Sequence, residues 1–333
     1  MNVIDVKHRG SIDWSAAVKP CRRAANDLLR AFDRSVQETL GSAGAWALSR
    51  GARALHAAFG HLYGSEVEAL AGAIGVEPEA VLVGNLAYDL TNAAACSTFV
   101  VGGDAPPLHA RNLDWMFPGQ LLREHTTVVR VSGAPAGPYA MVGWPGFFGG
   151  LTAVAPGRFS VTVNFVAQEE DTPAEAFARA LMGYWPVPWA VRTALDECAD
   201  YPSAVELLST MRLLSPVLFT VAGVRAGEAV VVERSPSRHA VRPLVRSSVC
   251  TTNHYASPEY AQPGAGSADS EERLRGLERS TRTSPPRDAD EAFRVLSRPL
   301  YLREETQHQV AMCAATGMLV VRIPGRGTWD VSA

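Results

Sequence analysis

The sequence predicts an α+β protein in which helices cover packed β-sheets. Helical periodicity dominates the first 95 residues, and short strand-like pieces begin at Cys96. The later elements come in blocks of strands, helices, strands, one helix and two closing strands, an order typical of layered α+β proteins. With 333 residues, 47% of them hydrophobic, the chain is long enough to bury a sizeable core.

The N-terminal segment 1–95 is predicted to be helical. Residues 15–40, SAAVKPCRRAANDLLRAFDRSVQETL, carry apolar side chains at helical spacing. Ser65 and Glu68 match a capping box, in which two residues bond each other's backbone amides at the start of a helix. We therefore expect a helix to begin near Ser65.

Strands and then two capped helices are predicted after Cys96. Five pieces separated by Gly and Pro have the composition of an antiparallel meander, at 97–101, 108–114, 126–132, 139–144 and 158–166. Thr172 with Glu175, and Ser203 with Glu206, then match capping boxes at the starts of two helices.

The remainder of the chain repeats this alternation. A second set of strands is predicted at 218–224, 228–234, 239–245 and 249–255. A stretch rich in Pro, Gly and Ser predicts a loop at 256–270. A capped helix at 288–298 and strands at 308–315 and 318–324 complete the predicted fold.

The composition argues against several classes of protein. The formal net charge is −3 and no long basic block is present, so nucleic-acid binding is not expected. The opening MNVIDVKHRGSIDW lacks the apolar core of a secretory signal, and no run of eighteen apolar residues occurs. The five cysteines form no CxxC pair. We therefore expect a reduced, cytoplasmic chain.

The sequence contains no recognisable cofactor or metal motif. It has no HExxH, and His56 and His61 would diverge on a helix. The glycine-rich GWPGFFGGL matches neither GxGxxG nor a P-loop, and no GxSxG is present. We expect neither a metal nor a cofactor.

Cys96 is the candidate nucleophile, although a lone cysteine heading a strand is more often a buried core thiol. A nucleophilic thiol needs a base, for which His109, His125 and His254 are candidates. The α-amino group of Cys96 is a further candidate if the chain is cut just before it. The alanines at 93–95 favour such a cut, because small side chains let the preceding carbonyl approach the thiol.

Polar residues downstream supply other groups that acyl chemistry requires. In ARNLDW, Asp114 can hold the new amine of Cys96, and Arg111 can fix Asp114. In a regular strand these two side chains point to opposite faces, so we expect the strand to end or bulge near Asn112. Asn253 in TTNHY is a candidate oxyanion donor.

Together these pieces resemble a known family. CST at 96–98, ARNLDW, GWPGFFGGLTAVAPGRFSVTVN, TTNHY and Ser270-x-x-Arg273 follow the order and spacing of the acid ceramidase and N-acylethanolamine acid amidase group. That group is part of the choloylglycine-hydrolase-like N-terminal-nucleophile (Ntn) hydrolases. VIDV and VLVGNLAYDL upstream, and PVPWAVRTALDECADYPSAVELL and ETQHQVAM downstream, extend the resemblance over nearly the whole chain.

The resemblance implies a four-layer αββα fold and autocatalytic cleavage between Ala95 and Cys96. A helical fragment 1–95 and a catalytic fragment 96–333 would then remain associated. The implied site consists of Cys96 as nucleophile and base, Arg111 and Asp114 as its polar support, Asn253 as oxyanion donor, Arg273 as a site arginine and Asn164 as a second oxyanion donor.

One position differs from the family pattern, because Phe165 follows Asn164 where relatives carry an acidic residue. Aromatic residues further motivate an apolar acyl pocket or its lid, formed by Trp144, Phe147, Phe148, Trp185 and Trp189.

These observations predict a cysteine amidohydrolase that cleaves a small-molecule N-acyl amide through an acyl-thioester on Cys96. One alternative is an acyltransferase that passes the acyl group to an amine or alcohol. The other is an uncleaved, catalytically silent binding protein, with which Phe165 is compatible. The apolar site segment also suggests contact with a membrane surface, without spanning it.

Overall fold

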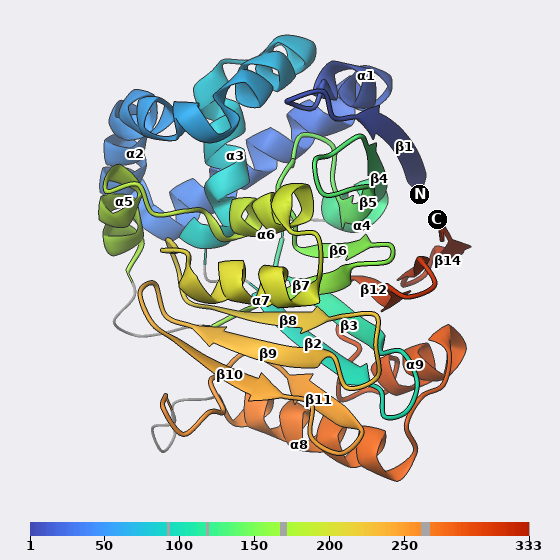
Figure 1. Ribbon diagram of the computed structural model, residues 1–333. Helices are drawn as coiled ribbons and strands as arrows, with labels where there is room; N and C mark the ends of the chain where they lie inside the picture. Colours follow the sequence, from blue (N-terminus) through green and yellow to red (C-terminus); the bar gives the residue numbers. More distant parts are fainter. Residues whose placement is uncertain (92–93, 118–119, 167–171, 261–266, 333) are drawn as a thin grey trace.

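Two β-sheets form the centre of the protein in a computed structural model, which describes residues 1–91, 94–117, 120–166, 172–260 and 267–332 (Figure 1). The eight-stranded sheet has the order β1 (Asn2–Lys7), β4 (Thr127–Ser132), β5 (Tyr139–Gly143), β6 (Thr152–Ala155), β7 (Phe159–Phe165), β8 (Val217–Ala222), β9 (Ala229–Arg234) and β10 (His239–Pro243). The six-stranded sheet has the order β11 (Ser248–Thr251), β2 (Ala94–Val101), β3 (Leu108–Trp115), β12 (Thr306–Cys313), β13 (Met318–Ile323) and β14 (Gly327–Asp330).

Helices cover the outer faces of both sheets. The eight-stranded sheet is covered by α2 (Arg22–Ile74), α3 (Pro78–Leu90), α5 (Pro173–Leu181), α6 (Val187–Glu197) and α7 (Tyr201–Thr210), and the six-stranded sheet by α8 (Ala268–Thr283) and α9 (Ala289–Leu296) (Figure 1). Short helices α1 (Trp14–Val18), η1 (Lys19–Cys21) and α4 (Leu121–His125) complete the set. This arrangement confirms the predicted four-layer αββα sandwich.

The two sheets pack face to face through alternating residues of their strands. Val142 and Val154 of the eight-stranded sheet share a buried cluster with Val310 and Leu319 of the six-stranded sheet. Polar bonds also cross between the sheets, because the ring nitrogens of His109 each lie 3.0 Å from a hydroxyl oxygen of β7. Since side chains alternate along a strand, the odd-numbered residues of β3 face this inner layer and the even-numbered ones face α8 and α9.

The N-terminal segment is largely helical, as predicted for 1–95, and it also contains the unpredicted strand β1. β1 pairs in parallel with β4 at the edge of the eight-stranded sheet. The backbone of α2 leaves helical geometry at Gly41 and at Tyr63, so a helical stretch restarts just before Ser65, near the start that the sequence predicts. Gly41 has a φ of 68°, a left-handed conformation that glycine adopts without strain. The division into fragments 1–95 and 96–333 stays a prediction.

A buried ion pair joins this segment to the rest of the chain. Glu66 on α2 accepts hydrogen bonds from both terminal nitrogens of Arg192 on α6, at 3.1 and 3.2 Å. The same carboxylate accepts from the indole nitrogen of Trp14 at 2.6 Å, and Arg192 also donates to Asp196 at 2.9 Å. Charges buried in this way are costly to separate, so the pair ties α2 firmly to α6.

The helix starts that the sequence predicts are partly confirmed. Thr172 caps α5 through a capping box with Glu175. The next helix, α7, begins earlier than predicted, because Asp200 is its cap and Ser203 is the box partner. Strands β1, β6 and β14 and helix α6 were not predicted. Of the predicted loop at 256–270, residues 261–266 lie outside the described residues.

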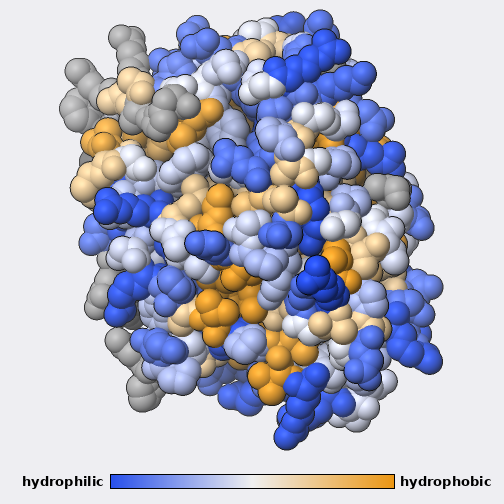
Figure 2. All heavy atoms as spheres, viewed as in Figure 1, coloured by the Kyte–Doolittle hydropathy of each residue, from blue (hydrophilic) through white to orange (hydrophobic). Residues whose placement is uncertain are grey.

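Hydrophilic side chains cover most of the face seen in Figure 2, and apolar ones gather toward its middle and lower part. The edge strand β10 exposes Val241 but ends at Pro243, which limits pairing with another chain. Among the helices of the described residues, none is long and apolar enough to cross a bilayer.

Candidate active site

Cys96 lies in the third position of β2, opposite Leu113 of β3. Its side chain is buried, as a core thiol would be, with 1% of its surface exposed. The thiol nevertheless has a charged partner, because Nη2 of Arg111 lies 2.9 Å from Sγ. A cationic neighbour is a feature that reactive cysteines share and that simple core packing does not need, so Cys96 stays the candidate nucleophile.

Arg111 is held on the inner face of the six-stranded sheet. Its Nη1 donates to the carbonyl of Leu151 at 2.8 Å and to the hydroxyl of Thr152 at 3.0 Å, so the guanidinium bridges the two sheets beneath Cys96. This fixed position aims a positive charge at the sulfur, which favours the thiolate.

Arg111 and Asp114 do not work as the pair that the sequence suggested. β3 keeps an unbroken register with β2 from Leu108 to Trp115, so the predicted bulge near Asn112 is absent from this pairing. The irregularity lies in the neighbouring strand β12, between Thr306 and His308. Arg111 and Asp114 therefore face opposite sides of the sheet.

Asp114 is a buried carboxyl opposite Ala95, the residue that precedes the nucleophile. Thr306 donates to its Oδ1 at 2.6 Å, and Oδ2 has no hydrogen-bond partner among the residues described. Burial raises the pKa of Asp114 from 3.8 to about 7, although the Thr306 bond and the charge of Arg273 lower it. This carboxyl therefore titrates near neutral pH.

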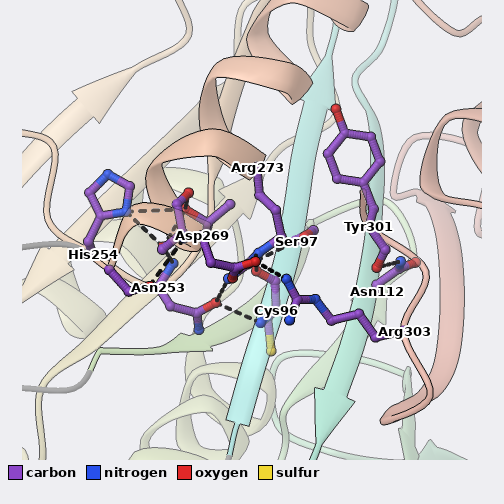
Figure 3. A network of polar contacts seen from close by, with 12 residues as sticks. Cys96, Ser97, Asn112, Asn253, His254, Asp269, Arg273, Tyr301 and Arg303 are labelled. Atoms are coloured by element: carbon purple, nitrogen blue, oxygen red, sulfur yellow. Dashed lines mark hydrogen bonds and ion pairs between the residues drawn. The ribbon is translucent and has the colours of Figure 1, made fainter. Parts of the chain in front are cut away.

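A second polar network reaches Cys96 from the opposite side of the sheet (Figure 3). Arg273 of α8 donates to the carbonyl of Cys96 at 2.6 Å, to the hydroxyl of Ser97 at 3.1 Å and to Oδ1 of Asn253 at 3.0 Å. The same Oδ1 accepts the backbone N–H of Cys96 at 2.8 Å. Asp269 holds Arg273 at 3.0 Å. The sulfur points away from this network, so the two sides of the sheet hold different atoms of one residue.

The two asparagines predicted as oxyanion donors are both engaged in the intact chain. Asn253 donates its side-chain amide to the carbonyl of Phe165 at 2.8 Å. Asn164 accepts from Thr98 at 2.8 Å and donates to the carbonyl of Thr252 at 2.9 Å. Their role as oxyanion donors stays a prediction, and their observed role is to join β2, β7 and the turn after β11.

The surroundings of the Cys96 thiol raise its pKa overall. Burial raises the pKa of Cys96, Arg111 lowers it, Asp114 raises it, and the backbone N–H of Asp114 and the charge of Arg273 lower it. Within the described part of the chain, no hydrogen bond joins Cys96 to His109, His125 or His254. His254 bonds to Ser270 instead, at 2.8 Å. The α-amino group of Cys96 thus stays the candidate base.

The predicted aromatic residues lie in the core beneath the helices. Trp144, Phe147, Phe148 and Trp189 are buried, and their rings contact one another in pairs at 5.2 to 5.9 Å between centroids. Trp185 is half-buried and packs against the same core cluster. Their assignment to an acyl pocket stays a prediction.

An open cavity of about 770 Å³ lies at the end of β3, where Trp115 and Phe117 line it together with Glu38, Glu304 and Gln307. Trp115 lies on the inner face of the six-stranded sheet, which also carries Arg111 and the side chain of Cys96.

Two exposed apolar residues lie at the end of α5, where Leu181 is 50% and Met182 is 64% exposed, shortly before Trp185 in the chain. The predicted membrane contact is untested.

Three residues near the thiol were not singled out from the sequence. Tyr88 on α3 is buried within electrostatic range of Cys96. Thr306 holds Asp114, and His308 lies directly across β3 from Cys96, since both residues pair with Leu113. The strand register brings Thr306 and His308 to this region and the packing of α3 brings Tyr88, and neither effect can be read from the sequence.

No grouping of three or more His, Cys, Asp or Glu side chains suited to a metal ion occurs within the described ranges. The polar groups around Cys96 are instead an arginine, an asparagine and a second arginine. Groups of this kind can orient an acyl group and stabilise developing charge.

The layered fold and the cysteine near the start of a central strand define the class: this is a four-layer Ntn-hydrolase fold. A solved structure of the Caenorhabditis elegans N-acylethanolamine-hydrolyzing acid amidase ortholog shares it, with a TM-score of 0.55 and 23% identity over 71% of this chain and 100% of that chain. No family model matches the sequence.

Sequence comparison names the relatives more narrowly. N-acylethanolamine-hydrolyzing acid amidase of Cavia porcellus is 32% identical over 52% of this chain and 48% of that protein. Acid ceramidase of Balaenoptera acutorostrata scammoni is 28% identical over 38% of this chain and 36% of that protein. The matches thus span about half the length of these relatives or less. They confirm the resemblance to the acid ceramidase and N-acylethanolamine acid amidase group.

Proposed function

We propose that this protein is a cysteine amidohydrolase that cleaves itself before Cys96 and then hydrolyses a small-molecule N-acyl amide. One observation carries the proposal. Side chains from three separate elements converge on a single residue, with Arg111 on its thiol, Asn253 on its backbone N–H and Arg273 on its carbonyl. Any fold must pair a buried backbone N–H and C=O, but here an amide and a guanidinium supply those bonds in place of a neighbouring strand, and a second guanidinium contacts the thiol.

Self-cleavage proceeds by an N-to-S acyl shift. Sγ of Cys96 bonds to the carbonyl carbon of Ala95, the peptide C–N bond breaks, and the thiol proton ends on the departing nitrogen. Water then hydrolyses the thioester, which frees the carboxylate of Ala95 and restores the thiol. Asn253 Oδ1 already accepts from the nitrogen that becomes the amine, so it can hold this group throughout.

In the mature enzyme the new amine is the base for the thiol, since its ordinary pKa of about 8 suits proton transfer near neutral pH. The thiolate attacks the substrate amide, the amine leaves with a proton, and water hydrolyses the acyl-thioester on Cys96. Arg111 favours the thiolate by its charge. The names of the relatives, which are amidases and a ceramidase, support amide substrates.

The fragments are expected to stay together after the cut. β1 belongs to the eight-stranded sheet, and Glu66 and Arg192 form a buried ion pair between the two fragments. α2 and α3 also share the main hydrophobic cluster with residues of the catalytic fragment.

Phe165 keeps the main-chain contact on which the proposal depends. Asn253 is positioned by the main-chain carbonyl of Phe165, which any residue at this position would supply. The Phe165 ring packs edge-on against Tyr88, with 6.1 Å between the ring centroids. The replacement of the family's acid therefore changes the lining of the site and keeps its hydrogen-bonded frame.

Intact mass of the purified protein tests the first step. We expect two fragments split before Cys96, and a single uncleaved chain for Cys96→Ala. Cys250→Ser is the matched control, because Cys250 is also a buried free thiol in the six-stranded sheet, and this variant should cleave normally. A full-length wild-type chain with no thiol reactivity would instead support the silent binding protein.

Turnover of the cleaved protein tests the second step. N-acyl amides of varied chain length are incubated with and without an added amine, and the products are identified by mass spectrometry. Free acid as the main product in both cases supports hydrolysis. An acyl-amine product that grows with the added amine supports the acyltransferase, and absence of any product from a cleaved chain would refute both.

A further inference from the structure

We propose that the hydroxyl of Tyr88 is an oxyanion donor for the reactions at Cys96, so that the helical fragment 1–95 contributes a catalytic residue. This inference rests on the proposed self-cleaving amidase and assigns a group that the proposal alone leaves open. It starts from a buried polar atom that has no hydrogen-bond partner among the described residues.

The side chain of Tyr88 is buried on α3, and its hydroxyl is unpaired within the described part of the chain. An unpaired buried polar group is costly and calls for an explanation. Tyr139 of β5 provides a contrast, because its equally buried hydroxyl donates to Asp196 at 2.7 Å. The fold thus supplies a partner for one tyrosine hydroxyl and none for the other.

The helix that carries Tyr88 is held in place on either side of it. Asn85, one turn earlier, donates to the carbonyl of Gly146 at 2.9 Å. Asp89, the next residue, accepts from the hydroxyl of Ser215 at 2.5 Å. A side chain between two such anchors keeps a fixed position, as a catalytic donor requires.

The ring of Tyr88 packs against two side chains that border the nucleophile. It contacts Trp115 of β3 and Phe165 of β7 edge-on, with 6.0 and 6.1 Å between the ring centroids. Trp115 lies on the same face of the six-stranded sheet as the Cys96 thiol. The carbonyl of Phe165 accepts from Asn253, which in turn holds the N–H of Cys96. The tyrosine therefore lies at the site and not elsewhere in the core.

The hydroxyl of Tyr88 keeps its proton and lies on the thiol side of α3. Burial raises its pKa well above the ordinary value of 10, Cys96 raises the pKa further, Asp89 adds less, and Arg111 lowers it. Electrostatic effects weaken with distance, so the larger effect of Cys96 than of the adjacent residue Asp89 indicates that the hydroxyl is near the sulfur. A neutral O–H in this place is a hydrogen-bond donor.

The chemistry at the sulfur requires a donor of this kind. When Sγ bonds to a carbonyl carbon, an electron pair moves from the C=O bond to oxygen, and the resulting oxyanion is only two bonds from the sulfur. This is true of the Ala95 carbonyl in self-cleavage and of the substrate carbonyl in turnover. Tyr88 would stabilise the charge by a hydrogen bond and retain its proton. Self-cleavage needs no substrate cavity, because the Ala95 carbonyl is covalently attached to Cys96.

The other polar donors near Cys96 already have acceptors in the uncut chain. The side-chain amides of Asn253 and Asn164 donate to main-chain carbonyls at 2.8 and 2.9 Å. Arg111 donates to the sulfur itself and to the carbonyl of Leu151. The O–H of Tyr88 has no such acceptor among the described residues, so it can bond a developing oxyanion without first breaking another hydrogen bond.

The test follows self-cleavage of the full chain, made by cell-free synthesis so that it starts uncut. Intact mass gives the cleavage rate from about pH 5 to about pH 9. We expect Tyr88→Phe to slow cleavage about 100-fold at every pH, as the loss of one oxyanion donor does, without shifting the midpoint of the pH profile. The material that does cleave should show a comparable loss of kcat on N-acyl amides, with KM little changed.

Stability separates this role from packing. In the Cys96→Ala background, Tyr88→Phe removes an unpaired hydroxyl and keeps the ring, so its Tm should rise or stay unchanged. Tyr139→Phe is the matched control. It removes the hydrogen bond to the buried Asp196 and should lower Tm, while in the unmutated background it should cleave at the wild-type rate.

The outcomes distinguish the two proposals. If the wild type cleaves itself and Tyr88→Phe does so equally fast, the role of Tyr88 is overturned and the amidase stands. A shifted pH midpoint also overturns it, because the hydroxyl then stabilises the thiolate and not the oxyanion. The same holds for a Tm that falls as far as for Tyr139→Phe, which indicates a structural tyrosine. If the wild type stays uncut, the self-cleavage proposal fails and this inference fails with it.

Discussion

Asp114→Asn should remove a large part of the pH dependence of stability. Burial raises the pKa of the Asp114 carboxyl from 3.8 to about 7, so the folded protein binds a proton that the unfolded chain releases. The stabilisation from this proton is fully present below about pH 4 and is lost as pH rises through about 7. One pKa unit corresponds to about 1.4 kcal/mol, so the full effect is about 4 kcal/mol.

Urea unfolding measures this effect over an accessible range. Both proteins are compared in a Cys96→Ala background, which keeps the chain uncut. Between about pH 5 and pH 8.5, the free energy of unfolding should fall by about 3 kcal/mol more for the protein that retains Asp114 than for the Asp114→Asn variant. The comparison cancels every other titrating group that the two proteins share. Equal pH slopes for the two proteins would show that Asp114 is ionised in the folded state and that the reasoning is wrong.

Two further predictions concern buried arginines, both measured in the Cys96→Ala background unless stated. Arg273→Met leaves the carbonyl of Cys96 without its partner and should lower the free energy of unfolding by about 3 kcal/mol, and in the unmutated background it should stop self-cleavage. The exposed Arg279 on the same helix is the control, since Arg279→Met should change neither quantity by a measurable amount. Arg192→Met leaves the buried carboxylate of Glu66 without its partner and should lower the free energy of unfolding, measured in urea, by about 3 to 5 kcal/mol. In cleaved protein the same substitution should release fragment 1–95 at a lower urea concentration, as seen by size-exclusion chromatography.

The sequence predicted most of the fold because its signals are local. Alternating strands and capping boxes identified the layers, and Thr172 marked its helix correctly. β1 was missed because a six-residue edge strand lies in helical surroundings and its parallel partner is far along the chain. α6 was missed because no Ser, Thr, Asp or Asn caps it: its N-cap is Pro186, and no side chain bonds the first turn.

The candidate site was predictable in its parts and not in its geometry. Residue types and their order singled out Cys96, Asn253 and Arg273, which the fold brings into contact. It was harder to predict which face of β3 each side chain occupies, because a sequence pattern cannot tell whether a bulge lies in a strand or in its neighbour. It lies in β12, and this keeps Arg111 on the thiol side and Asp114 on the other.

The position of Cys96 in the sheet has a consequence for the proposed mature chain. Chain ends are usually disordered, and an amine on a disordered end would adopt many orientations, few of which place it beside the thiol. Here the new terminus would be paired with β3, since Cys96 lies opposite Leu113 although it lies beyond the end of the β11 pairing, and Arg273 fixes the carbonyl of the same residue. The proposed cut would therefore produce an end that is already ordered, and the new amine would need no later folding step before it could act as a base.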